Sequence, residues 1–398
     1  MLKKIINVFL ILFFSVIIIY ADEVELTSDK YILYNLNDNK VLLEKDSHEE
    51  TQIASLTKIM TVIISIENIK NFNDEVVITK EMLKGLTWDI ATIGLKSGDK
   101  VTYNDLLYAT MLPSAADAVN ALALSINGSY ENHLMIMNAK AKELELNNTH
   151  YSNVIGLYDK DNYSSAYDIS KLLLYCLKNE KFKEIFEAKT YTMSNGKKID
   201  TTIKKYDSPY IKGSKTGFTT KAGRCIASIS SINGVDYLFV TLNNYNKIPI
   251  YINETVNTYK YYENNYSYKK IIDENDVIVT LKTKYAKEKN IDIKVDKEYT
   301  YYLKNDFNKN DLTYKYTGIG VISYFTKKGT KIGTLDIIYN DEVIKRVDLL
   351  YNGNLRFSLI KYLWFNKYII LAIFVIWFIL HKKKRKIKRR IYKMLNKV

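Results

Sequence analysis

The C-terminal end of the chain restricts where the rest of it can fold. Residues 362–380 are apolar except for Asn366 and Lys367, and residues 381–398 carry ten lysines or arginines and no acidic residue. About 20 apolar residues in a helix span a bilayer, and basic flanks stay on the cytoplasmic side. We therefore predict a transmembrane helix over residues 362–380 and a basic cytoplasmic tail over residues 381–398. A helix lying on the membrane surface is the alternative, but residues 368–380 are apolar on every face.

The N-terminal end predicts that the folded part lies outside the cell. Two lysines precede an apolar run over residues 5–20, and the small Ala21 follows. This order is typical of a signal peptide, which we assign to residues 1–21. Ile19 stands where a small residue is usual before the cleavage point, so an uncleaved N-terminal anchor is the alternative.

The basic composition does not indicate nucleic-acid binding. The formal net charge is +14, and ten of the basic residues lie in the C-terminal tail. Basic residues in such a tail set the membrane topology and bind anionic lipid. Nucleic-acid binding instead needs a basic patch on a folded domain. We therefore predict a membrane as a partner and no nucleic acid.

The cysteines and histidines predict neither a metal site nor a cofactor. Cys176 and Cys225 lie in apolar stretches, so we expect two free buried thiols rather than a disulfide. Together with the four histidines they show no metal-ligand spacing. None of the histidines lies in a recognisable triad motif, which argues against a Ser-His-Asp hydrolase.

Ser55 and Lys58 are the strongest sign of chemistry. Residues three apart at the start of an apolar-periodic stretch share one helix face, so their side chains can meet. A serine hydroxyl becomes a good nucleophile when a base takes its proton, and lysine serves as that base when it is kept neutral. The four-residue pattern is weak alone, but Lys215-Thr216-Gly217 follows later, and the two match the signature of penicillin-recognising enzymes.

The pattern of apolar residues predicts a sheet formed from both ends of one domain. A hairpin is expected over residues 30–43, and two strands over residues 224–231 and 237–242 are joined by a turn at Asn233-Gly234. Helices are expected between them. Their predicted ranges are 54–69, 103–111, 115–124, 129–145 and 167–177, with a break at Leu112-Pro113-Ser114.

In order and spacing, several segments resemble the low-molecular-weight penicillin-binding proteins, the serine D-alanyl-D-alanine carboxypeptidases that trim peptidoglycan. The segments are Ala54 to Thr61, Leu106 to Ser114, Asn153 to Leu157, Ala166 to Asp168, Gly213 to Thr219 and Ala222 to Cys225. The resemblance implies an α+β fold of the penicillin-binding and β-lactamase type, with an antiparallel sheet flanked by helices, over residues 22–262. A small β-rich domain over residues 268–353 and the C-terminal transmembrane helix would follow.

The resemblance also implies the catalytic roles. Ser55 would attack the carbonyl between two D-alanines and form an acyl-enzyme, with Lys58 as the general base. Ser114 would pass the proton to the departing D-alanine. The substrates would be peptidoglycan stem peptides that end in D-Ala-D-Ala, and β-lactam antibiotics would bind covalently as inhibitors.

The second motif would bind the substrate from an edge strand. Lys215 would hold Lys58 neutral by its charge and attract the substrate's terminal carboxylate, to which Thr216 would offer its hydroxyl. Gly217 would leave room for the substrate backbone. The backbone N–H groups of Ser55 and Phe218 would stabilise the oxyanion, each such donor being worth about 3 kcal/mol.

The chain departs from the family pattern at one important position. The family usually has Ser-x-Asn where this chain has Ser114-Ala115-Ala116, so the amide that contacts the lysine and the substrate is absent. Asn120 lies one helical turn further on and does not simply replace it. Arg224 stands where an aromatic residue is common, and we interpret it as a surface substitution.

We therefore favour a membrane-anchored serine carboxypeptidase with its catalytic domain outside the cell. The alternative, from another class of function, is a penicillin-binding scaffold protein with weak catalysis. A β-lactamase is the third hypothesis, but no loop with a glutamate suited to activating a deacylating water is recognisable.

Overall fold

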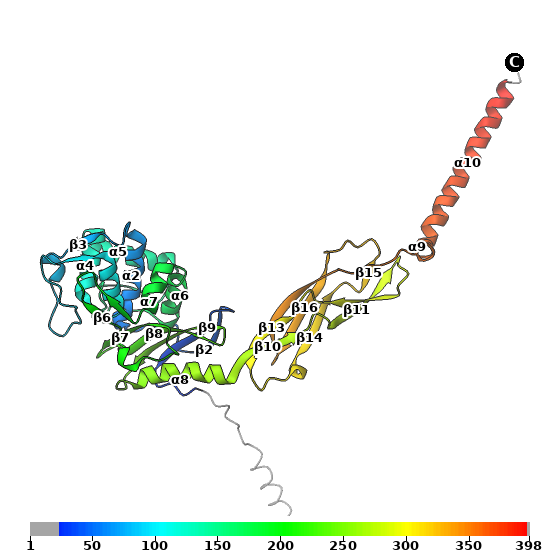
Figure 1. Ribbon diagram of the computed structural model, residues 1–398. Helices are drawn as coiled ribbons and strands as arrows, with labels where there is room; N and C mark the ends of the chain where they lie inside the picture. Colours follow the sequence, from blue (N-terminus) through cyan, green and yellow to red (C-terminus); the bar gives the residue numbers. More distant parts are fainter. Residues whose placement is uncertain (1–23, 396–398) are drawn as a thin grey trace, which may run out of the picture. The chain divides into compact units, whose positions relative to one another are not determined.

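The computed structural model describes residues 24–395, and the predicted signal peptide lies outside this range. The chain forms two compact units that divide after Asn264 (Figure 1). Each unit has a hydrophobic core of its own.

The first unit is organised on a five-stranded antiparallel sheet in the order β2-β1-β9-β8-β7. Its strands are β1 (Lys30–Asn35), β2 (Lys40–Lys45), β7 (Gly213–Thr219), β8 (Gly223–Ile232) and β9 (Val235–Asn244). The first hairpin pairs with β9, so that Leu33 lies opposite Phe239. The predicted hairpin and the sheet built from both ends of the domain are therefore confirmed.

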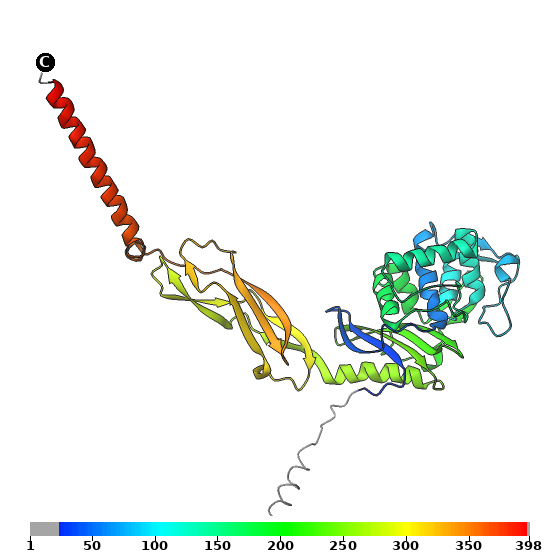
Figure 2. The same ribbon diagram turned by 180° about the vertical axis from the view of Figure 1, so that it is seen from behind.

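Helices cover both faces of this sheet. The helices of the main layer are α2 (Thr57–Asn68), α3 (Tyr103–Met111), α4 (Ala116–Asn127), α5 (Tyr130–Glu143), α6 (Ala166–Cys176) and α7 (Glu180–Glu187). Helix α8 (Ile250–Asn265) lies on the other face of the sheet in both views (Figures 1 and 2), where the Tyr259 ring contacts Phe239. The free cysteines Cys176 and Cys225 are both buried, as predicted.

Helix α2 is the centre of the main layer. Ten of its residues, from Thr57 to Ile66, are buried, because α3, α4, α5, α6 and α7 all pack against it. The helix expected over residues 54–69 begins instead with the 3-10 turn η1 (Ala54–Leu56). Ser55 therefore lies on a tight turn directly before the regular helix.

Shorter elements complete the first unit. Two antiparallel strand pairs are β3 (Glu75–Val77) with β4 (Lys100–Thr102) and β5 (Thr190–Thr192) with β6 (Lys198–Asp200). Two further 3-10 turns are η2 (Glu81–Leu83) and η3 (Lys204–Tyr206). Thr102 and Asp105 form a capping box at the start of α3, where each side chain accepts a backbone N–H of the other residue.

The second unit is rich in strands. They are β10 (Tyr266–Ile272), β11 (Val277–Lys284), β12 (Asn290–Lys294), β13 (Tyr299–Lys304), β14 (Thr313–Gly318), β15 (Val321–Ser323), β16 (Lys331–Tyr339) and β17 (Glu342–Leu350), with the turn η4 (Lys309–Asp311). They form three small sheets, β10-β13, β12-β11-β15 and β14-β16-β17. Leu335 and Ile337 of β16 are fully buried in the core that these sheets enclose.

The C-terminal segment differs from the single helix predicted over residues 362–380. It forms α9 (Leu359–Phe365) and α10 (Lys367–Leu395), which are bent by 73° at Asn366. The Asn366 side chain donates a hydrogen bond to the Tyr362 carbonyl at 2.8 Å, so it competes with the continuing backbone ladder. Within residues 24–395 no single helix meets the length and hydropathy needed to cross a bilayer, although this bent pair does so together.

Candidate active site

Ser55 is held in a strained turn that exposes its hydroxyl to a cavity. Ala54 has a φ of 46°, which is unfavourable for a residue with a side chain. Gly156 lies against this turn, and a Cβ atom on Gly156 would stand 2.1 Å from the Ala54 carbonyl oxygen. The close fit explains the glycine and shows that the 152–157 segment supports the turn that carries Ser55.

Lys58 contacts Ser55 directly. Its Nζ atom lies 2.9 Å from the Ser55 Oγ atom and donates to the Ile155 carbonyl at 2.6 Å. Only 3% of Lys58 is exposed, and burial lowers the pKa of its amine to about 7. A neutral amine at this position is able to accept the serine proton near neutral pH.

Ser114 and Lys215 form a second contact of the same kind. Ser114 lies between α3 and α4 with a φ of 66°, and its Oγ atom accepts a hydrogen bond from Lys215 Nζ at 2.9 Å. Lys215 lies on β7, the edge strand of the sheet, and is only 1% exposed. The pair is assembled from two elements that are 101 residues apart in the chain.

The electrostatic relation between the two lysines differs from the one expected from sequence. Burial, rather than the charge of Lys215, lowers the pKa of Lys58. Burial also lowers the pKa of Lys215 well below its usual range, and the nearby Lys58 lowers it further. In the free protein, burial thus favours the neutral form of Lys215, whereas a bound carboxylate would favour its protonated form.

Gly217 has a structural reason for lacking a side chain that the sequence did not indicate. A Cβ atom on Gly217 would lie 2.9 Å from the Ser55 backbone nitrogen and 3.0 Å from the Ile53 carbonyl oxygen. The glycine therefore lets β7 pass close to the Ser55 turn, and its expected role in leaving room for the substrate stays a prediction.

Thr216 and Phe218 flank this glycine. The Thr216 hydroxyl already contacts the Thr202 hydroxyl at 2.6 Å, and only 8% of Thr216 is exposed. Phe218 is 57% exposed and is paired in register with Arg224 of the neighbouring strand.

Arg224 supports Phe218 and is not a simple surface substitution. Its guanidinium carbon lies 4.5 Å from the centre of the Phe218 ring, and its Nε atom donates to the Asn246 carbonyl at 2.9 Å. A cation over an aromatic face is worth about 0.5–1 kcal/mol at a partly exposed site. The arginine thus stabilises the strand end whose backbone N–H is a candidate oxyanion donor.

A cavity of about 370 Å³ brings part of the predicted set together. Ser55, Lys58, Ser114, Phe218 and Ala116 all line it. Lys215, Thr216 and Gly217 of β7 lie outside its lining, and Lys215 connects to it through its hydrogen bond to Ser114. Ala116 therefore presents a methyl group where the family has an amide.

Sequence reasoning assigned no role to two supporting groups. Asp117 is buried at the start of α4, and its carboxylate accepts the backbone N–H groups of Ile93 and Leu95, which fixes the loop beside the cavity. Asn153 accepts the backbone N–H of Gly156 at 2.7 Å. An acidic residue in the first turn of a helix and an Asn-x-x-Gly spacing are the sequence signals that could have located them.

No group of histidine, cysteine or acidic side chains within residues 24–395 is arranged to hold a metal ion. The groups around Ser55 in the cavity include the Lys58 amine, the Ser114 hydroxyl and the backbone amide of Phe218. This set is suited to acyl transfer through a serine.

Comparison with known proteins identifies the family of this chain. Residues 18–246 match the peptidase S11 family, described as D-alanyl-D-alanine carboxypeptidase, and residues 266–355 match the C-terminal domain of penicillin-binding protein 5. The D-alanyl-D-alanine carboxypeptidase DacF of Bacillus subtilis is 30% identical over 330 residues, which are 79% of this chain and 82% of that protein. DacD of Escherichia coli is 26% identical over 301 residues, covering 69% of this chain and 73% of that protein.

Solved structures show the same fold. The D-alanyl-D-alanine carboxypeptidase DacD of Francisella tularensis superposes with a TM-score of 0.68 at 20% identity, covering 86% of this chain and 97% of that one. Penicillin-binding protein 5 of Haemophilus influenzae gives a TM-score of 0.63 at 19% identity, covering 84% and 99%. The fold is thus a penicillin-binding catalytic domain followed by a β-rich domain.

The chain belongs to the D-alanyl-D-alanine carboxypeptidase family. It is accordingly a serine-type carboxypeptidase of the penicillin-binding class with a role in the cell wall.

Proposed function

We propose that this protein is a membrane-anchored enzyme that removes the terminal D-alanine from peptidoglycan stem peptides through an acyl-enzyme. Ser55 is the nucleophile and Lys58 is the base. The observation that carries this proposal is the contact of 2.9 Å between Ser55 Oγ and an amine that is buried and has a pKa of about 7. A base with this pKa suits proton transfer at neutral pH.

The reaction proceeds in two halves. Ser55 Oγ bonds to the carbonyl carbon between the two D-alanines while its proton passes to Lys58, and the backbone N–H groups of Ser55 and Phe218 stabilise the oxyanion. The C–N bond then breaks, and the amine of the departing D-alanine takes, through the Ser114 hydroxyl, the proton that Lys58 received from Ser55, so that Lys58 is neutral again. Water next attacks the ester and gives its proton to Lys58, which restores the Ser55 hydroxyl. With a β-lactam the amine stays attached to the acyl group.

The substrate's terminal carboxylate is proposed to bind at β7. Lys215 would become protonated beside it, and the Thr216 hydroxyl would turn from Thr202 to the carboxylate. Support comes from the buried amine of Lys215, which is one hydrogen bond from the cavity through Ser114.

Labelling with a fluorescent penicillin, followed by mapping of the modified residue, tests the site assignment. We expect the label on Ser55, together with release of D-alanine from a synthetic stem pentapeptide. A label on another serine would contradict the assignment, and labelling without D-alanine release would contradict the proposed activity.

Membrane attachment through the C-terminal segment is part of the proposal. It is supported by the apolar composition of residues 368–380, by the ten basic residues after them and by the bent pair α9 and α10. The catalytic domain would lie outside the cell and the basic tail would lie in the cytoplasm.

Truncation tests the anchor. The chain should be cut after Ser358, because Ala286 and Lys287 of the β-rich domain pair with Phe357 and Arg356. We expect a soluble protein that still binds penicillin. If the truncated protein remains with washed membranes, the C-terminal segment is not the sole anchor.

A weakly catalytic scaffold is the second candidate, and the methyl group of Ala116 in the cavity favours it. Loss of one hydrogen bond to the substrate costs about 1–3 kcal/mol. Such a protein would acylate with penicillin but release little D-alanine, so comparison of the two rates separates the candidates.

A further inference from the structure

One end of the β-rich domain is formed by three segments of the chain. Strands β11 and β15 are parallel, so they end at the same edge of their sheet, next to the chain that leads into α9 (Figures 1 and 2). Backbone hydrogen bonds join the segments, since Tyr324 donates to the Lys284 carbonyl at 2.9 Å and Ser358 donates to the Tyr285 carbonyl at 3.0 Å. The three segments therefore form one continuous surface.

The side chains on this surface are aromatic and partly exposed. The centre of the Tyr285 ring lies 5.8 Å from that of Phe325, and the centre of the Tyr324 ring lies 5.2 Å from that of Phe357. Phe325 is 58% exposed, Tyr324 38% and Phe357 36%. Tyr285 has a φ of 63°, which is costly for a bulky residue and persists only where the surroundings hold it. We call these four residues the aromatic surface.

Basic residues surround the aromatic surface, and little acidic charge opposes them. Eight lysines or arginines and one acidic residue lie in the three segments, which are residues 284–289, 324–328 and 356–367. The acidic residue, Glu288, is already paired with Arg356 at 2.7 Å. Lys327 and Lys328 are exposed, and in the described part of the chain neither forms a salt bridge. Exposed rings edged by free ammonium groups match a partner that is apolar within and anionic outside, as a bilayer with anionic lipid is.

Helix α9 connects the aromatic surface to the segment that is proposed to cross the membrane. It has seven residues, which amount to about 10 Å of helix, and α10 follows after Asn366. Helix α9 also packs on the aromatic surface, because the centre of the Tyr285 ring lies 5.1 Å from that of Tyr362 and 5.8 Å from that of Phe365. The aromatic surface is thus fixed close to the start of α10.

The length of the apolar stretch in α10 brings the bilayer still closer. Residues 368–380 form about 20 Å of helix, whereas the hydrocarbon core is about 30 Å thick. A membrane helix that is shorter than the core thins the bilayer and draws its flanking residues into the interface. We therefore expect α9, and with it the aromatic surface, at the depth of the lipid headgroups.

We propose that the aromatic surface is a lipid-contact site of the β-rich domain itself. Tyr324, Phe325 and Phe357 enter the headgroup region of the extracellular leaflet, and Lys327 and Lys328 bind the phosphate groups of anionic lipid. This inference rests on the proposed membrane anchor and adds a second contact that the anchor helix does not supply. Aromatic rings and lysines are the side chains that favour this depth. The contact would hold the β-rich domain against the membrane.

A dye that reports its surroundings tests the contact in the full-length protein. Cys176 and Cys225 are both buried, so a single exposed cysteine can be labelled selectively with the dye NBD. Phe325→Cys places the dye on the aromatic surface, where its ring system replaces the phenyl ring. Glu342→Cys places it at the start of β17, at the far end of β16 from residues 324–328. The labelled proteins are reconstituted into vesicles that contain phosphatidylglycerol, with and without a lipid that carries a nitroxide quencher near its headgroup.

The dye at position 325 should be quenched and the dye at position 342 should not. Interfacial side chains lie about 5–10 Å deep, within reach of the nitroxide, so we expect at least about threefold quenching at position 325. Lys327→Glu combined with Lys328→Glu should remove at least about half of this quenching, because it reverses the charge that faces the anionic headgroups. Lys294→Glu combined with Lys345→Glu reverses two exposed lysines elsewhere on the same domain and should leave the quenching unchanged.

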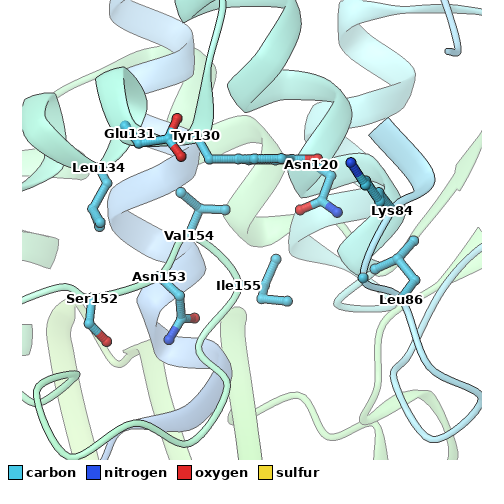
Figure 3. Close-up of a pocket in the computed structure, with 11 residues that line it drawn as sticks. Lys84, Leu86, Asn120, Tyr130, Glu131, Leu134, Ser152, Asn153, Val154 and Ile155 are labelled. Carbon is cyan, nitrogen blue, oxygen red and sulfur yellow. The ribbon is translucent and has the colours of Figure 1, made fainter. Parts of the chain in front are cut away.

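Glu131→Cys controls for an apolar environment that the protein itself provides. Figure 3 shows Glu131 at a pocket of the first unit that Leu134 and Val154 also line. A dye at this position contacts apolar protein surface without lipid, so its emission should stay the same when the nitroxide lipid is added.

The results separate this inference from the proposed anchor. Protein that floats with the vesicles but shows no quenching at position 325, or quenching that survives reversal of Lys327 and Lys328, would overturn the lipid contact and leave the anchor standing. Blue-shifted emission at position 325 without quenching would mean that protein covers Phe325, and would overturn the lipid contact as well. Protein that does not float with the vesicles would overturn the anchor and the lipid contact together.

Discussion

Two lysine–serine contacts of equal length stand at the active site, and the chain builds them in different ways. Lys58 meets Ser55 at 2.9 Å within one turn and helix, and Lys215 meets Ser114 at 2.9 Å across 101 residues. Lys58 lines the catalytic cavity, whereas Lys215 lies behind Ser114 and outside the lining. We therefore expect the two pairs to serve different tasks, because both Ser55 and Lys58 line the cavity whereas only the serine of the second pair does.

Removal of the proposed nucleophile Ser55 should have the largest effect on activity of all the substitutions. Ser55→Ala should abolish both penicillin labelling and D-alanine release, because within residues 24–395 Ser55 supplies the only hydroxyl that contacts Lys58. Ser114→Ala is the matched change in the second pair and should slow release while penicillin labelling persists. Covalent labelling of the Ser55→Ala protein would show that Ser55 is not the nucleophile.

Exchange of each lysine for arginine should separate the two tasks. A guanidinium stays protonated, so Lys58→Arg cannot accept the serine proton and should lower acylation by at least about a thousandfold. Lys215→Arg keeps a cation for the carboxylate and should retain measurable activity. The measurement is the second-order rate of acylation by a penicillin. Equal residual rates in the two variants would contradict the division of roles.

Ala116→Asn would restore the amide that the family has between the two pairs. If the amide reaches Lys58 and the substrate, acylation should rise by about 10- to 100-fold, which corresponds to a recovered hydrogen bond of about 1–3 kcal/mol. Ala116→Leu is the control, since it fills the same space without a donor and should slow acylation. A rate within about twofold of the wild type for both variants would show that position 116 does not contact the substrate.

The pH dependence of acylation should report the buried amine of the local pair. Lys58 acts as a base only when neutral, and burial lowers its pKa to about 7. The acylation rate should therefore fall about tenfold for each pH unit below 7 and reach a plateau above it. Ser114→Ala should leave this midpoint in place. A rate that keeps rising beyond pH 9 would indicate that Lys58 has the pKa of an ordinary exposed lysine.

Arg224 should give the smallest effect, because it acts through Phe218. Arg224→Ala removes the cation above the Phe218 ring and the hydrogen bond to Asn246, and should slow acylation by about three- to tenfold. Arg224→Tyr would stack on the same ring and should recover much of the loss. If the alanine variant acylates at the wild-type rate, Arg224 has no positioning role.

Local pattern was enough to predict much of the fold. Helix periodicity placed Lys58 beside Ser55, and the alternation of apolar residues predicted the first hairpin and the Asn233-Gly234 turn. These features depend on residues close in sequence, whose backbone geometry fixes which side chains share a face. The same rule failed at residue 366, where the C-terminal segment forms two helices bent by 73° instead of the single predicted helix.

Local sequence pattern was thus sufficient to predict the contact between Ser55 and Lys58, the strands at both ends of the first domain and the apolar and basic character of the C-terminal segment. It did not predict that Gly217 makes room for the Ser55 turn, that Arg224 stacks on Phe218 or that burial lowers the pKa of Lys58. Close approach and desolvation depend on which distant segments surround a group. That information appears only when the sheet, the helices and the 152–157 segment have come together.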